Sequence, residues 1–92
     1  MTIERRRVVY QGRVQGVGFR MTARRLASSH PISGSVRNLD DGRVELIIEG
    51  DAHHLGLYLG ALQREFGDMI RDITVEQEEP EGEPLSGFSI LY

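Results

Sequence analysis

The period of the hydrophobic pattern changes several times within these 92 residues, and the order of those changes restricts the fold more than any other feature. Residues 5–14 are rich in β-branched and aromatic side chains, which is typical of a strand. Residues 19–27 place mostly apolar side chains at i, i+3, i+4, i+7 and i+8, which is one face of a helix. Pro31 favours an end to that helix just upstream. The first part of the chain is therefore a strand followed by a helix.

The pattern continues with further strands and one further helix. An Asp-Asp-Gly sequence at residues 40–42 is typical of a hairpin turn between two alternating segments. Asp51 is suited to cap a second helix and Gly67 to end it. Residues 78–87 are acidic and rich in proline and glycine, which indicates an exposed loop. The remaining predicted elements are strands over residues 32–39, 43–50, 69–77 and 88–92, and a helix over residues 51–66.

The predicted order is β-α-β-β-α-β followed by a short strand, which is the split βαβ order of the ferredoxin-like folds. In this α+β sandwich an antiparallel sheet carries both helices on one face. Right-handed crossovers place the first and third strands side by side in the centre, so we predict the strand order 4-1-3-2. The pairing of the short C-terminal strand stays open. A chain of this length is expected to form one domain, residues 1–92.

Charge is distributed unevenly along the chain. Residues 1–39 hold eight arginines and one acid, whereas residues 40–92 hold three arginines and thirteen acids. The chain has no lysine, and arginine is the side chain best suited to hold a phosphate or carboxylate with two hydrogen bonds. Two interpretations stay open, a compositional bias or a positive first half that attracts an anion. The acidic second half argues against a nucleic-acid partner.

The residue types that the chain lacks also restrict its function. The chain has no cysteine, which excludes disulfides, thiol nucleophiles, zinc–thiolate sites and iron–sulfur clusters. We expect no metal site, because His53 and His54 are adjacent and diverge on a helix. The N-terminal segment has no apolar stretch long enough for a signal peptide or a membrane span. We therefore expect a cytoplasmic protein with no membrane partner.

The sequence GRVQGVGFR, residues 12–20, connects the first predicted strand to the first helix. One interpretation is a tight turn, because glycine readily adopts positive φ angles. The other is a loop whose backbone N–H groups converge on a phosphate-sized anion at the positive end of the helix. In that case Arg20, in the first helical turn, would add a fork of donors to the same anion. The spacing matches neither a dinucleotide-binding fingerprint nor a P-loop.

A second segment, residues 34–50, contains Asn38 just before the predicted hairpin turn. Alone, Asn38 is interpreted as an ordinary turn asparagine. Together, however, the two segments resemble the two signature sequences of the acylphosphatase family. The first carries G-x-V-Q-G-V-x-F-R from Gly12 to Arg20, and the second carries G-x-V-R-N-x-x-x-G-x-V-x-x-x-x-x-G from Gly34 to Gly50.

This resemblance implies an enzyme that hydrolyses the carboxyl–phosphate bond of small acyl phosphates to a carboxylate and inorganic phosphate. It implies that Arg20 binds the substrate phosphate, that Asn38 orients the attacking water, and that no cofactor takes part. The backbone amides implied to hold the phosphate, or another anion, are those of Gln15, Gly16, Val17, Gly18 and Phe19. A carboxylate leaves without a general acid, because its conjugate acid has a pKa of about 4 to 5.

Two alternatives stay open at this point. One is a regulatory domain that binds phosphate or acyl phosphate with little turnover, although the presence of both Arg20 and Asn38 counts against it. The other is a ferredoxin-like nucleic-acid binder, against which the acidic second half and the lack of a stacking pair of aromatics on one strand both count. We expect a monomer, although an apolar sheet face without helices would suit a dimer.

Three further expectations concern the environment of particular residues. Ser35 stands where the family usually has an aromatic residue, so we expect lower stability or a looser Asn38 rather than lost chemistry. The run of arginines at residues 5–7 is interpreted as a solvated start of the first strand. Ile73 and Val75 are expected to face the core from the fourth strand.

Overall fold

The computed structural model describes residues 2–92. In it, helices and strands form where the hydrophobic spacing predicts them. The elements are β1 (Ile3–Gly12), α1 (Phe19–Ala27), β2 (Ile32–Asn38), β3 (Val44–Asp51), α2 (Ala52–Phe66), a 3-10 turn η1 (Gly67–Met69), β4 (Ile70–Glu78) and β5 (Phe88–Leu91). The largest difference from the prediction is in β1, which begins and ends two residues early. Within the described residues, neither α-helix has the length and apolarity needed to span a membrane.

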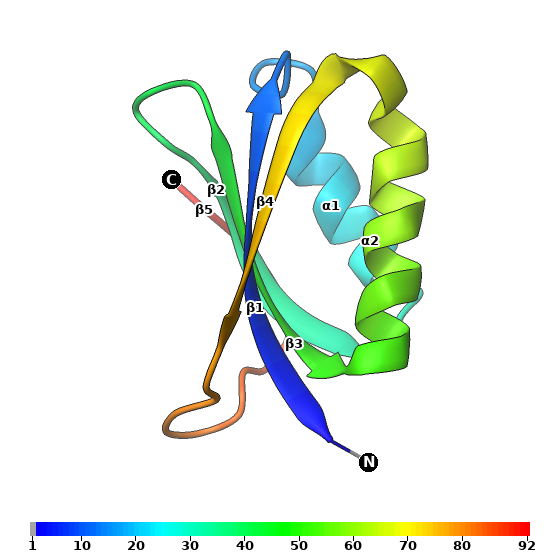
Figure 1. The fold of residues 1–92 in the computed structure, drawn as a ribbon, viewed down its shortest axis with the longest axis vertical. Helices are drawn as coiled ribbons and strands as arrows, with labels where there is room; N and C mark the ends of the chain where they lie inside the picture. Colours follow the sequence, from blue (N-terminus) through cyan, green and yellow to red (C-terminus); the bar gives the residue numbers. More distant parts are fainter. Residues whose placement is uncertain (1) are drawn as a thin grey trace.

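The five strands form one sheet in the order β4-β1-β3-β2-β5, and both helices cover the same face of it (Figure 1). This confirms the order 4-1-3-2 for the first four strands, which pair antiparallel throughout. The sheet is not wholly antiparallel, because β5 pairs parallel to β2. The chain leaves β4 at the end of the sheet where β2 begins, so β5 starts beside the start of β2 and runs the same way.

The core lies between the sheet and the two helices. Tyr58 of α2 is fully buried and its hydroxyl donates to the carbonyl oxygen of Ala23 in α1 at 2.8 Å, which joins the helices to each other. Burying one large apolar side chain stabilises a fold by roughly 1.5–3 kcal/mol, so these buried side chains are a main source of stability. The fully buried large side chains are Tyr10, Tyr58, Phe19, Leu46, Ile48, Leu55, Leu62, Val8, Val14, Val36 and Val44.

The edge strand β4 buries its core-facing side chains only in part. Ile73 and Val75 pair with the core strand β1, but 37% of Ile73 and 53% of Val75 stay exposed. Directly paired residues share a face of the sheet, so Ile73 beside Tyr10 and Val75 beside Val8 face the core side as predicted. Their burial is incomplete because β4 lies at the edge of the sheet and packs chiefly against β1.

The sheet face opposite the helices is polar rather than apolar. Glu49 of β3 accepts hydrogen bonds from Arg5 at 2.8 and 3.0 Å, and Glu45 accepts one from Arg7 at 2.7 Å. Both glutamates are nearly buried, at 8% exposed for Glu45 and 5% for Glu49. The expectations of an apolar open face and of a merely solvated arginine run are therefore wrong, because Arg5 lies across from Glu49 and Arg7 reaches Glu45 further along the same neighbouring strand.

Gly12 sets the direction in which β1 leaves the sheet. The register with β4 shifts between Gln11 and Gly12, which marks a β-bulge. A Cβ atom at Gly12 would collide with the carbonyl oxygen of Met69, so only glycine fits this approach. Beyond the bulge, the β1–α1 loop, the β2–β3 hairpin turn and the α2–β4 connection all lie at one end of the sheet (Figure 1).

Candidate active site

The loop between β1 and α1 leaves its backbone donors free. Gly16 and Gly18 adopt φ angles of 76° and 80°, a region that favours glycine. The loop is anchored at its start, where the Arg13 N–H donates to the Met69 carbonyl oxygen at 2.8 Å, and at its end, where the Gly18 carbonyl accepts from the Thr22 N–H at 2.9 Å. Between these anchors, no acceptor among the described residues bonds the N–H groups of residues 15–21. Unpaired backbone donors of this kind favour an anion.

The start of α1 is also suited to bind an anion. No side chain caps the helix at Gly18, and its first turn contains no acidic residue. Arg20 is the charged residue of that turn, whereas Arg24 and Arg25 lie in the last turn, where they complement the helix dipole. The absence of a cap or an acid leaves the positive helix end available to an external anion.

Asn38, the last residue of β2, lines the same small cavity as residues of the β1–α1 loop. This cavity has a volume of about 100 Å³, which is room for more than one water molecule. Its lining residues are Val14, Gly16, Gly18, Phe19, Arg20, Met21 and Asn38. Of the predicted site residues, the structure thus brings Gly16, Gly18, Phe19, Arg20 and Asn38 together. Gln15 and Val17 do not line the cavity, and Val17 is exposed.

Arg20 also contacts the C-terminal strand. Its Nη1 lies 3.5 Å from the carbonyl oxygen of Leu91, a long hydrogen bond, and its guanidinium lies over the ring of Tyr92 with a separation of 4.9 Å. Neither contact was predicted from the sequence. The parallel register of β5 on β2, which pairs Leu91 with Arg37, creates them, and no local sequence signal indicates it.

The side chain of Gln15 joins the loop to the β2–β3 turn, a contact that was not predicted from the sequence. Its Nε2 donates to the carbonyl oxygens of Leu39 at 2.8 Å and Arg43 at 2.9 Å. These carbonyls belong to the β2–β3 turn, immediately after Asn38. The loop is therefore attached to the turn that follows the strand carrying Asn38.

Arg37, next to Asn38, does not compete for an anion. Its Nε donates to Glu45 at 2.7 Å, and Glu45 also accepts from Arg7. Burial opposes ionisation of Glu45, but the hydrogen bonds from Arg7 and Arg37 outweigh it and lower the pKa of this carboxyl below its usual value. The ionised Glu45 thus holds both arginines on the open face, and Arg20 is the charged residue that lines the cavity.

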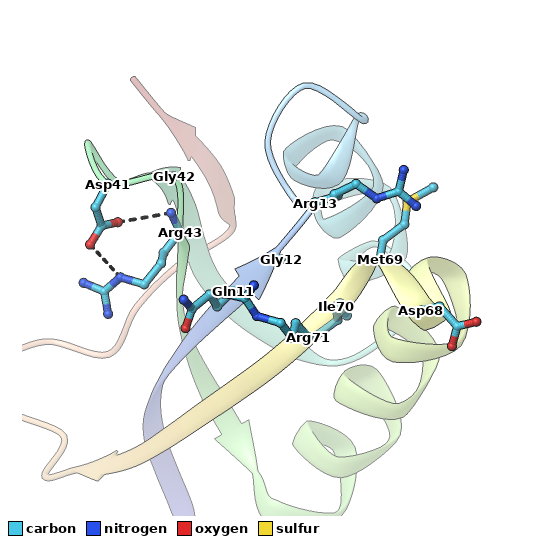
Figure 2. A pocket seen from close by; sticks show the side chains of 10 residues that line it. All are labelled: Gln11, Gly12, Arg13, Asp41, Gly42, Arg43, Asp68, Met69, Ile70 and Arg71. Atoms are coloured by element: carbon cyan, nitrogen blue, oxygen red, sulfur yellow. Dashed lines mark hydrogen bonds and ion pairs between the residues drawn. The ribbon is translucent and has the colours of Figure 1, made fainter.

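A larger groove of about 650 Å³ lies at the same end of the sheet (Figure 2). It is lined by the end of β1 with the start of the loop after it, the β2–β3 turn, η1 and the start of β4, and its charged lining residues are Arg13, Asp41, Arg43, Asp68 and Arg71. Asp41 accepts hydrogen bonds from the N–H and Nε of Arg43, and the backbone bond is the main cause that lowers the pKa of Asp41. The groove shares no lining residue with the smaller cavity.

The residues around the smaller cavity restrict its chemistry. None of them is a histidine, aspartate, glutamate or lysine, so no side chain there transfers a proton near neutral pH. Across residues 2–92, no group of three or more His, Asp or Glu side chains is placed to hold a metal ion. The arrangement can bind an anion through amides and a guanidinium, and it can hold water through the amide of Asn38.

Comparison with known proteins identifies the family. The sequence profile of the acylphosphatase family matches residues 6–90. An acylphosphatase of Haloarcula marismortui is 41% identical over the full length of both chains, and one of Bacillus licheniformis is 40% identical over 94% of this chain and 96% of its own. The crystal structure of acylphosphatase from Bacillus subtilis superimposes with a TM-score of 0.86 at 35% identity, covering 99% of this chain and 100% of that chain. The chain therefore belongs to the acylphosphatase family.

Proposed function

We propose that this acylphosphatase hydrolyses the carboxyl–phosphate bond of small acyl phosphates and releases a carboxylate and inorganic phosphate. The observation that carries the proposal is the shared cavity of about 100 Å³, lined by the glycine loop, Arg20 and Asn38. The names of the full-length relatives support the same activity. Because every residue assigned a role comes from one chain, a monomer suffices.

The phosphate group of the substrate binds at the β1–α1 loop. The N–H groups of residues 15–19 donate to its oxygens, and Arg20 contributes a charged fork of donors. These donors are aimed before the substrate arrives, because two left-handed glycines shape the loop. Fixed donors of this kind stabilise the negative charge of a phosphoryl group in the transition state.

Asn38 holds the attacking water beside the bound phosphate. Its side-chain amide accepts one hydrogen bond from water and donates another, which orients a lone pair of the water toward phosphorus. As the new P–O bond forms, the bond to the acyl oxygen breaks and its electron pair stays on the departing carboxylate. The water proton passes to an oxygen of the substrate phosphate. The low basicity of a carboxylate makes a protein acid unnecessary, and the proposal assigns no step to a cofactor.

The test uses benzoyl phosphate with a chelator present, and follows loss of the anhydride. We expect Arg20→Gln to lower kcat/KM by at least about a hundredfold and to abolish inhibition by inorganic phosphate. Asn38→Ala should lower kcat by about a hundredfold while phosphate still inhibits. Arg13→Gln, at a variable position of the first signature, is the matched control and should retain wild-type kinetics.

Three outcomes would contradict the proposal in different ways. Absence of turnover with tight phosphate binding would indicate a regulatory domain instead of an enzyme. Wild-type rates in Asn38→Ala would remove the water-orienting role. Wild-type phosphate inhibition in Arg20→Gln would remove the role of Arg20 in phosphate binding.

A further inference from the structure

The side chain of Gln15 directly connects two parts of the site that the sheet connects only through β3. Asn38 ends β2 and the loop follows β1, but β1 and β2 are not neighbours, because β3 lies between them. The sheet links them only indirectly, because Tyr10 of β1 and Asn38 of β2 both pair with Val44 of β3, and the loop begins beyond the end of β1. The two hydrogen bonds from Gln15 Nε2, to Leu39 at 2.8 Å and Arg43 at 2.9 Å, bridge this gap directly.

The two acceptors are the carbonyls that close the β2–β3 turn. The Leu39 N–H donates to the Arg43 carbonyl oxygen at 2.8 Å, and the Gly42 N–H donates to the Leu39 carbonyl oxygen at 3.2 Å. Gln15 adds a second donor to each of these oxygens. Its amide thus holds the closed turn from the loop side, one residue beyond Asn38.

We propose that Gln15 is a positioning residue for hydrolysis, whose side chain holds Asn38 at a fixed distance from the bound phosphate. This inference rests on the proposed function of Asn38. The amide of Gln15 acts on the water-orienting residue and not on the phosphate, because both of its N–H donors already bond the turn.

The chemistry of the contact requires an amide. Two carbonyl oxygens need two N–H donors, and the NH₂ group of glutamine supplies both without charge. A methionine has nearly the same length and no donor. An ionised glutamate would direct oxygens at the two carbonyls, which repels them, whereas a protonated glutamate restores one donor.

The kinetic test is a double-mutant cycle between Gln15→Met and Asn38→Ala, with Gln63→Met on the exposed side of α2 as the matched control. We expect Gln15→Met to lower kcat about tenfold and to change inhibition by inorganic phosphate less than about twofold. In the Asn38→Ala background the same change should cost less than about twofold, because the residue being positioned is gone. Gln63→Met should match wild type throughout.

Gln15→Glu supplies a pH profile that a purely structural role would not produce. We expect its kcat, relative to wild type at the same pH, to be lowest above neutrality and to rise as the pH falls and the introduced carboxyl becomes protonated. A constant ratio across the pH range would contradict the proposal. This variant also serves if Gln15→Met lowers the melting temperature too far for assay.

A measurement without turnover separates this inference from the proposed function. In NMR spectra of the phosphate-bound protein, the side-chain amide signals of Asn38 should shift and broaden in Gln15→Met and stay unchanged in Gln63→Met. If wild type binds phosphate but hydrolyses nothing, the proposed function fails while this readout still tests the positioning. Additive effects in the cycle, a phosphate affinity that falls as much as kcat, or unchanged Asn38 signals would overturn the inference.

Discussion

The guanidinium of Arg20 lies 4.9 Å from the centre of the Tyr92 ring, and its Nη1 lies 3.5 Å from the carbonyl oxygen of Leu91. Arg20 is in the first turn of α1, whereas these contacts come from the end of β5. The C-terminal strand thus lies beside the proposed phosphate site and limits the positions that the arginine can adopt.

We expect Tyr92→Ala to weaken binding of inorganic phosphate by about twofold to fivefold, with a smaller change in kcat. An exposed cation–π contact contributes about 0.5–1 kcal/mol, and Tyr92 is 99% exposed. Isothermal titration with phosphate measures the effect. Tyr92→Phe keeps the ring and should bind like wild type, and equal losses in both variants would show that the ring contact is not the cause.

The ion pairs on the open face predict a pH dependence of stability. The hydrogen bonds from Arg7 and Arg37 hold the folded-state pKa of Glu45 below its unfolded value of about 4.3. Stability from this carboxylate is therefore fully present above the unfolded pKa and is lost as the pH falls through the folded pKa. We expect Glu45→Gln to lower the free energy of unfolding at pH 7 by roughly 1–3 kcal/mol.

Urea unfolding between pH 2 and 7 measures this dependence. The difference between wild type and Glu45→Gln should begin to shrink below about pH 4, where the carboxyl of the unfolded chain takes up a proton, and should be lost once the pH falls through the lowered folded-state pKa. Glu76→Gln is the control, since Glu76 is 3.8 Å from Arg7 and largely exposed, and it should change stability by less than about 1 kcal/mol. A constant difference for Glu45→Gln at all pH values would contradict the role of ionisation.

Replacing Ser35 with an aromatic residue should raise stability. Ser35 lies across from Ile47 of β3 and beside Ser89 of β5, on the face without helices. An aromatic side chain would cover Ile47, and cross-strand pairs of this kind contribute roughly 0.2–1 kcal/mol. We expect Ser35→Trp to raise the melting temperature by about 1–8 °C in a domain of this size. A lower melting temperature than wild type would contradict the expectation that serine costs stability here.

Substitution of Gly12 should destabilise the fold for a steric reason. A Cβ atom there meets the backbone of Met69 and Arg71, which cannot move without disturbing β4. We expect Gly12→Ala to lower the free energy of unfolding by about 2 kcal/mol or more in chemical denaturation. Gly82→Ala also has a positive φ but open space around it, so its cost should be close to about 1 kcal/mol. Equal costs at the two positions would rule out the collision as the cause.

The order of elements and the order of four strands could be predicted because both depend on local periodicity and on the handedness of crossovers. Arg20 could be proposed as an anion-binding residue from local sequence as well, because a glycine loop that opens a helix has a known geometry. The burial of Glu45 could not be predicted. It alternates like a solvent-facing residue, and only the register that brings Arg7 and Arg37 to it explains why a carboxylate lies there.

The sequence by itself determined the fold class, the family signatures and the residue types of the site, because these depend on spacing along the chain. The tertiary structure alone decided that Asn38 and Arg20 share one cavity, that Gln15 bonds the turn after Asn38, and that β5 runs beside β2 to reach Arg20. Those relationships join residues from 18 to 71 positions apart, and their distances depend on strand order and register. No local propensity encodes such a distance, since it arises only when the elements pack.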